Sequence, residues 1–124
     1  MEMTSLNKDG KMICCLSGDI DHHSSRSIRD SIDKLIIQNR PKVLVLDLSE
    51  IAFMDSSGLG LVLGRYRKMK ECGGEMFLCN TNERTLKILK MAGVDKIIKN
   101  ISEDKCRNRF EGVNDNGKTK TDQE

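Results

Sequence analysis

The chain has 124 residues, of which 37% are hydrophobic and 32% charged, and its formal net charge is +2. This length is typical of one domain with its own core. Basic and acidic residues alternate along the chain and aromatic residues make up only 3%, so we expect no direct binding to DNA or RNA. No apolar run approaches the roughly 20 residues that span a bilayer, so we also expect no membrane contact.

The N-terminal stretch and the cysteines bear on location and cofactors. The first residues include an acid and lack the basic and apolar regions of a secretory signal, which predicts a cytoplasmic protein. The cysteines form an odd set of five without a C-x-x-C pair. Such a set favours inert thiols over a metal site or a disulfide scaffold, and we expect no cofactor.

The first half of the chain predicts a hairpin and then a helix. The hairpin covers Thr4 to Ser17 around an Asp9-Gly10 turn, a strong hairpin signal. A polar loop is expected over residues 17–23. Ser24 or Ser25 then caps a helix that Pro41 ends, and the buried stripe of this helix is formed by Ile28, Ile32, Leu35 and Ile36.

A central strand and a second helix follow. Residues 43–48 form a run that is apolar except for Asp47, as expected of a central strand, and residues 49–54 are expected to connect it to the next helix. The second helix is predicted from about Ser56 to Glu71, and Cys72-Gly73-Gly74 ends it. Its predicted buried stripe consists of Leu59, Val62, Leu63, Tyr66 and Met69.

The remaining elements are shorter. We expect a strand over Glu75 to Cys79, a helix capped by Thr81 or Asn82 that ends at Gly93, and a short strand near Lys96 to Lys99. The apolar positions of that helix are Leu86, Leu89 and Ala92. A last helix is possible near residues 102–110, and residues 112–124 have the composition of a disordered polar tail.

The alternation of strands and helices predicts the fold class. After an N-terminal β-hairpin, the order favours an α/β domain with a mainly parallel, mixed β-sheet covered by α-helices. We therefore predict a single domain over residues 1–111 and a tail over residues 112–124.

Two neighbouring histidines suggest a metal site, but their spacing argues against one. Asp21-His22-His23-Ser24 could hold a metal, but neighbouring histidines in a loop do not both turn inward easily, and the chain has no further histidine. We interpret this stretch as a polar loop in which Asp21 or Ser24 helps to cap the first helix.

Catalysis by the paired serines is also disfavoured. A Ser-His-Asp hydrolase could be assembled from Ser56 or Ser57 with the histidines, but the negative charge of Asp55 would oppose an oxyanion. Gly58-Leu59-Gly60 resembles part of a phosphate loop without the Gly-Lys-Ser/Thr that should follow. We therefore predict no catalytic residue and no enzyme activity.

Covalent modification of Ser56 fits the residues better. If Asp55 caps the second helix, Ser56 occupies the first helical position, where its hydroxyl is exposed and the helix dipole partly favours an added phosphate. Asp55 and Gly58 serve the helix start, and Ser57 supports the turn. A phosphoryl group would add about −1.5 to −2 charges and disturb any surface that docks there.

The motifs together resemble a known family. FMDSSGLG followed by LGRY, with GDIDHH upstream and GGEMFLCN downstream, is similar to the anti-sigma factor antagonists of the STAS family, in particular those of sporulation in endospore-forming bacteria. The resemblance runs from about Met3 to Asn100.

The resemblance implies regulation by partner switching. In this family the unmodified antagonist binds an anti-sigma factor, which is itself an ATP-dependent serine kinase, and so frees the sigma factor. The kinase phosphorylates the serine after the motif's Asp, here Ser56, and a phosphatase resets it. The resemblance also assigns Asp21, together with residues 55–59 (Asp55, Ser56, Ser57, Gly58 and Leu59), to the partner-binding surface. An alternative is a stand-alone STAS module that senses a nucleotide or another anion at the Ser56 helix terminus.

Overall fold

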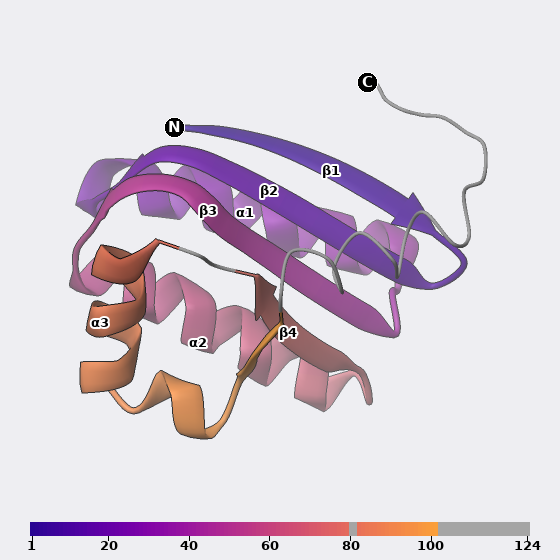
Figure 1. The fold of residues 1–124 in the computed structure, drawn as a ribbon. Coiled ribbons are helices and arrows are strands. Elements are labelled where there is room, and N and C mark those ends of the chain that lie inside the picture. Colours follow the sequence, from indigo (N-terminus) through magenta and orange to yellow (C-terminus); the bar gives the residue numbers. More distant parts are fainter. Residues whose placement is uncertain (80–81, 102–124) are drawn as a thin grey trace.

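The computed structural model describes residues 1–79 and 82–101 (Figure 1). In chain order its elements are β1 (Glu2–Lys8), β2 (Lys11–Ile20), α1 (His22–Asn39), β3 (Val43–Met54), α2 (Ser56–Glu71), β4 (Glu75–Cys79), α3 (Glu83–Met91), a 3₁₀ helix η1 (Val94–Lys96) and β5 (Lys99–Ile101). The possible last helix and the predicted tail lie outside the described residues, as does Thr81.

The strands form one mixed sheet in the order β1-β2-β3-β4-β5. β1 and β2 are antiparallel and joined by Asp9 and Gly10, whose φ angles of 53° and 80° give the left-handed backbone that a two-residue hairpin turn requires. The other neighbouring pairs are parallel. The predicted hairpin and mainly parallel sheet are confirmed.

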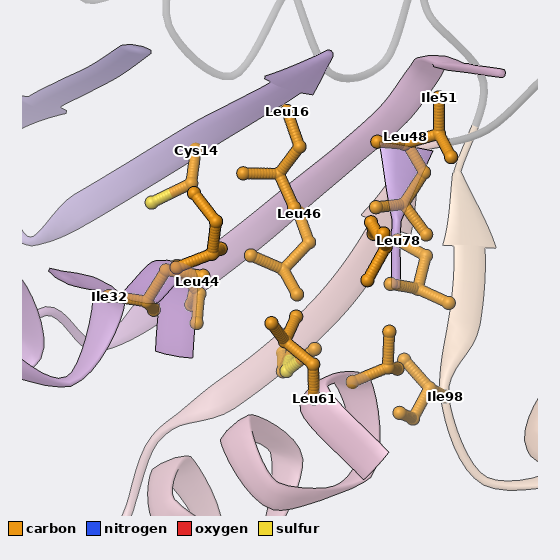
Figure 2. Packing of buried hydrophobic residues seen from close by; sticks show 14 of the residues in the cluster. Cys14, Leu16, Ile32, Leu44, Leu46, Leu48, Ile51, Leu61, Leu78 and Ile98 are labelled. Carbon is orange, nitrogen blue, oxygen red and sulfur yellow. The ribbon is translucent and has the colours of Figure 1, made fainter. Parts of the chain in front are cut away.

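The helices cover one face of this sheet. Because successive parallel strands are neighbours and crossovers are right-handed, α1, α2 and α3 are all directed to the same side. Paired rows of side chains from β2, β3 and β4 face the helices, among them Met12, Leu44 and Met76 in one row and Cys14, Leu46 and Leu78 in the next. Figure 2 shows four members of these rows, Cys14, Leu44, Leu46 and Leu78, in one cluster with Ile32 of α1 and Leu61 of α2. Ile28, Ile32 and Ile36 of α1 are buried as predicted, whereas the fourth predicted position, Leu35, is only partly buried.

The opposite face of the sheet carries a smaller apolar cluster. Its fully buried or nearly buried members are Val45, Cys79 and Ile101, with Ile13, Val43 and Phe77 packed against them. β3 therefore buries side chains on both faces, which explains the consecutive apolar residues Val43 to Leu46 and agrees with its central position.

Two strands are longer than predicted. Residues 17–20 continue β2 where a loop was expected, and residues 49–54 continue β3 where a crossover was expected. The two segments pair with each other through register shifts between Cys15 and Ser17 and between Gly18 and Asp19. These bulges interrupt the alternation of apolar and polar residues, which hid the strands in the sequence.

Two predictions near the C-terminal end of the described chain also need correction. The strand expected near Lys96 to Lys99 begins only at Lys99, and η1 occupies residues 94–96. Gly93, with a φ of 78°, reverses the chain after α3 and allows this short helical turn. Of the apolar positions predicted for α3, Leu89 is buried, whereas Ala92 is exposed and Thr85 is buried instead.

The buried face of α2 is rotated from the predicted stripe. Val62 and Met69 are buried as expected, but Leu61 and Arg65 are buried too, whereas Leu59, Leu63 and Tyr66 are only partly buried. The reason is that α2 packs against α1 as well as the sheet, and Arg65 meets a carboxylate of α1 there. The Arg65 Nε atom lies 2.8 Å from Asp33 Oδ1.

Candidate functional site at two helix starts

The start of α2, residues 55–58, has the cap that the sequence predicts. Asp55 is the N-cap, and its Oδ1 atom accepts a hydrogen bond from the Ser57 backbone N-H at 2.7 Å. The Gly58 N-H donates to the Asp55 carbonyl at 2.9 Å. Ser56 is the first helical residue and is exposed. The cap therefore uses the backbone around Ser56 and leaves its hydroxyl at the surface.

Gly58 packs this start tightly against the sheet. A Cβ atom there would overlap Met54 Cγ, and it would lie 2.8 Å from Met54 Sδ and 3.2 Å from Ile20 Cγ2. The Asp55 N-H also donates to the Ile20 carbonyl at 3.2 Å. The first turn of α2 thus rests on the ends of β2 and β3, which holds Ser56 in one place.

The start of α1, residues 21–24, has a reciprocal cap. The Ser24 N-H donates to Asp21 Oδ1 at 2.9 Å, and the Asp21 N-H donates to Ser24 Oγ at 3.1 Å. The predicted capping role of Asp21 is confirmed, since Asp21 rather than Ser24 or Ser25 is the N-cap, and Ser24 completes a capping box. Helix α1 begins at His22, inside the stretch that was expected to be a polar loop. The hydrogen bonds from the Ser24 backbone and side chain lower the pKa of the Asp21 carboxyl.

The two starts are neighbours because two parallel strands end side by side. Ile20 of β2 pairs with Met54 of β3, and Asp21 and Asp55 are the next residues along each strand. Neighbouring strands lie about 4.8 Å apart, and the carboxyl edge of such a sheet is the usual place for a site. The structure therefore brings together Asp21 and residues 55–59, which lie far apart in the sequence.

A groove of about 530 Å³ lies between the first turns of α1 and α2. We call it the α1–α2 groove. Its walls are His22, His23, Ser25, Arg26 and Arg29 from α1, and Ser57, Gly60 and Leu61 from α2. The side chains of the two serines thus have different surroundings, since Ser57 lines the groove and Ser56 does not.

The sequence reasoning missed two features beside Ser56. Arg26 and Arg29 belong to the groove, and their i, i+3 spacing in a helix that begins at His22 would have placed them on one face. Phe53 is 49% exposed directly before the α2 start. No local pattern marks Phe53, because its exposure depends on where the pairing of β2 and β3 ends.

A hydrolase site would need a hydrogen bond between one of the paired serines and one of the histidines. Within residues 1–79 and 82–101, no hydrogen bond joins Ser56 or Ser57 to His22 or His23, although Ser57 and both histidines line one groove. No group of three or more His, Cys, Asp or Glu side chains among the same residues is suited to a metal ion.

The thiols lie away from these starts. Cys14 and Cys79 are buried free cysteines, Cys15 is half-buried and Cys72 is exposed. Burial raises the pKa of the Cys14 thiol to about 12. Burial and the nearby Asp47 carboxylate raise the pKa of the Cys15 thiol to about 11. Both are protonated at neutral pH and therefore poor nucleophiles. Cys106 lies outside the described residues.

In the described part of the chain, none of the helices has the length and apolar character needed to cross a membrane.

Comparison with known proteins identifies the class. The STAS domain model matches residues 3–108, so the chain belongs to the STAS domain family. The predicted resemblance and single-domain α/β fold are confirmed. Within this family, the chain is 43% identical over 89 residues to an anti-sigma F factor antagonist of Paenibacillus polymyxa, a match that covers 72% of this chain and 76% of that protein.

Two solved structures have the same fold. The unphosphorylated form of the anti-sigma factor antagonist SpoIIAA superposes with a TM-score of 0.75 at 27% identity, covering 91% of this chain and 99% of that one. The phosphorylated form of the Bacillus cell fate determinant SpoIIAA superposes with a TM-score of 0.69 at 28% identity, covering 87% and 98%. SpoIIAA thus has this fold in both its unphosphorylated and its phosphorylated form.

Proposed function

We propose that this protein is an anti-sigma factor antagonist that is switched off by phosphorylation of Ser56. Unmodified, it binds an anti-sigma factor and releases the sigma factor that the anti-sigma factor holds. The exposed Ser56 hydroxyl at a rigid, capped helix start is the observation that carries this proposal. The 43% identical relative named as an anti-sigma F factor antagonist supports it.

The proposed docking surface surrounds that hydroxyl. It comprises Asp21, Asp55, Ser56, Ser57, Gly58 and Leu59, and we add the exposed ring of Phe53. The strand ends and the tight packing of Gly58 hold this surface in shape before a partner arrives, which lowers the ordering cost of binding.

Phosphorylation acts here through charge and bulk. The phosphoryl group would add about −1.5 to −2 charges next to Asp55, at a surface that already contains the Asp21 carboxylate. The α2 N-terminus tolerates an added anion, because its free N-H groups and dipole favour negative charge. The fold therefore tolerates the phosphoryl group, and the modification weakens the binding of the partner.

The proposal includes the enzymes that operate the switch. The anti-sigma factor is the kinase, uses ATP and retains ADP, and a serine phosphatase removes the phosphate from Ser56. The antagonist itself carries no catalytic residue and acts in the cytoplasm during sporulation. A binding protein of this kind needs no metal or cofactor of its own.

Titration with the anti-sigma factor of the same organism in the presence of ADP tests the proposal. We expect the wild-type protein and Ser56→Ala to bind with similar affinity, and Ser56→Asp to bind at least tenfold more weakly, a difference of about 1.4 kcal/mol. The matched control is Ser57→Ala, which removes the neighbouring hydroxyl. Equal affinities for Ser56→Asp and Ser56→Ala would contradict the charge mechanism.

A further inference from the structure

The α1–α2 groove carries positive charge that the fold does not use. Arg26 is exposed, and no carboxylate of the described residues lies within ion-pair distance of it. Arg29 Nε lies 3.4 Å from Asp30 Oδ1, but the two side chains are 45% and 68% exposed. Such exposed pairs contribute little and exchange partners readily. Both guanidinium groups are therefore available to a ligand.

The acidic side chains near the groove are not among its lining residues, and each contacts another group of the protein. Asp21 accepts the hydrogen bonds of the α1 capping box. Asp33 contacts the buried Arg65 between the two helices. Asp30 lies beside Arg29 at the surface and does not line the groove. The groove lining contains Arg26 and Arg29 and no acidic residue, so the wall that α1 contributes presents an excess of positive charge.

The shape of the groove favours an extended ligand. Its basic residues run from His22 to Arg29, which is about 10 Å along a helix at 1.5 Å per residue. The α2 wall is low there, because Ser57 is small and a Cβ at Gly60 would meet no atom within 4 Å. An open wall of this length, with two arginines among its polar side chains, suits an extended chain with acidic groups better than one compact anion.

The groove is continuous with the proposed docking surface. Ser57 belongs to the groove, and its neighbour Ser56 lies at the centre of that surface. The surface around Ser56 includes the carboxylates of Asp21 and Asp55, whereas the groove is basic. A partner that covers both must present acidic side chains to the groove.

We propose that the α1–α2 groove binds an acidic segment of the anti-sigma factor, with the guanidinium groups of Arg26 and Arg29 as its main contacts. This inference rests on the proposed function and adds a second contact area beside Ser56. The contact supplies charge complementarity, so its effect is greatest at low salt.

Charge reversal in the groove, measured by titration with the anti-sigma factor at 50 mM and 300 mM salt, tests this proposal. We expect Arg26→Glu to weaken binding on the order of tenfold at low salt and to flatten the salt dependence. Arg26→Lys keeps the charge and should remain close to the wild type. The matched control is Lys87→Glu, which makes the same charge change at an exposed position of α3.

The outcomes separate this proposal from the proposed function. Wild-type affinity for Arg26→Glu, together with weak binding by Ser56→Asp, would overturn the groove contact and leave the phosphorylation switch intact. Equal weakening by Lys87→Glu would also overturn it, since the effect would then be one of net charge. If neither the wild type nor Ser56→Ala binds the anti-sigma factor, both proposals fail.

A small anion is the competing occupant. Calorimetry of the free protein with inorganic phosphate distinguishes it from an acidic segment. Saturable phosphate binding that Arg26→Glu abolishes would assign the groove to a small anion and overturn the proposal. We expect no saturable heat in this titration.

Discussion

The two helix starts use the same cap and differ at the third helical residue. Asp21 and Asp55 each accept a backbone N-H in the first turn that follows them. In α1 the third residue is Ser24, whose side chain returns a hydrogen bond to the Asp21 N-H. In α2 the third residue is Gly58, which has no side chain and is pressed against Met54 and Ile20.

This difference bears on why the α2 start suits the proposed switch. The α1 start is closed by its own side chains, and the residues exposed after Asp21 are two histidines. The α2 start is held by close packing of its backbone on the strand ends, so the cap does not use the Ser56 hydroxyl. The same capping residue thus serves a start that is closed by its own side chains and, beside it, a start with an exposed hydroxyl.

The largest expected effect comes from disrupting the Arg65–Asp33 ion pair between α1 and α2. Arg65 is 7% exposed and meets Asp33 across the α1–α2 contact, and burial lowers the pKa of its guanidinium, opposed by the Asp33 charge. Asp33→Asn removes the negative charge opposite this cation and should cost about 3 kcal/mol of unfolding free energy, since a buried charge without its counter-charge keeps its desolvation penalty.

Chemical denaturation measures this loss against a matched control. Asp30→Asn removes the carboxylate of the exposed pair with Arg29 and should change the unfolding free energy by less than about 0.5 kcal/mol. Equal effects of the two substitutions would mean that the Asp33 contact does not hold the helices together.

Overpacking at the third residue of α2 tests the difference between the starts directly. Gly58→Ala should lower the unfolding free energy by about 2 kcal/mol, because the new Cβ overlaps Met54. Gly60→Ala meets open space and should raise it by about 0.5 to 1 kcal/mol through the helix propensity of alanine. In thermal denaturation, the melting temperature should fall for Gly58→Ala and rise for Gly60→Ala. A rise for both variants would refute the described packing of Gly58.

Removing the α2 cap has a smaller effect. Asp55→Ala should cost about 1 kcal/mol, because the Ser57 N-H loses its acceptor. Asp55→Asn keeps an acceptor oxygen and should retain most of the stability. Urea titrations of both variants measure these changes in unfolding free energy. An equal decrease for Asp55→Ala and Asp55→Asn would show that the charge, rather than the hydrogen bond, supports the cap.

The smallest effect is the pH dependence of the α1 cap. The folded-state pKa of Asp21 lies below its ordinary value of 3.8, so its contribution is present above that pH and is lost as the pH falls through the folded-state pKa. Asp21→Asn does not titrate, so the stability difference between it and the wild type should shrink below about pH 4. A difference that stays constant from pH 7 to pH 2 would contradict the capping role of the carboxylate.

The sequence predicted features that depend on local chemistry. The Asp55 cap, the α2 boundaries from Ser56 to Glu71 and the Asp9-Gly10 turn follow from a few neighbouring residues, and the structure confirms them. The alternation of strands and helices was enough for the fold, because right-handed crossovers leave few arrangements.

The features that the sequence did not predict depend on residues far apart in the chain. The extra length of β2 and β3 comes from their pairing with each other across bulges. The burial of Arg65 and the α1–α2 groove arise only when two helices meet. No single stretch of sequence carries that information.

Mapping the phosphate after incubation with the anti-sigma factor and ATP tests the central claim most directly. Mass spectrometry of wild-type protein should find one phosphoryl group, on Ser56, and Ser56→Ala should remain unmodified while Ser57→Ala is still phosphorylated. Phosphate on Ser57 in the wild type, or no phosphate at all, would contradict the assignment of Ser56 as the switch.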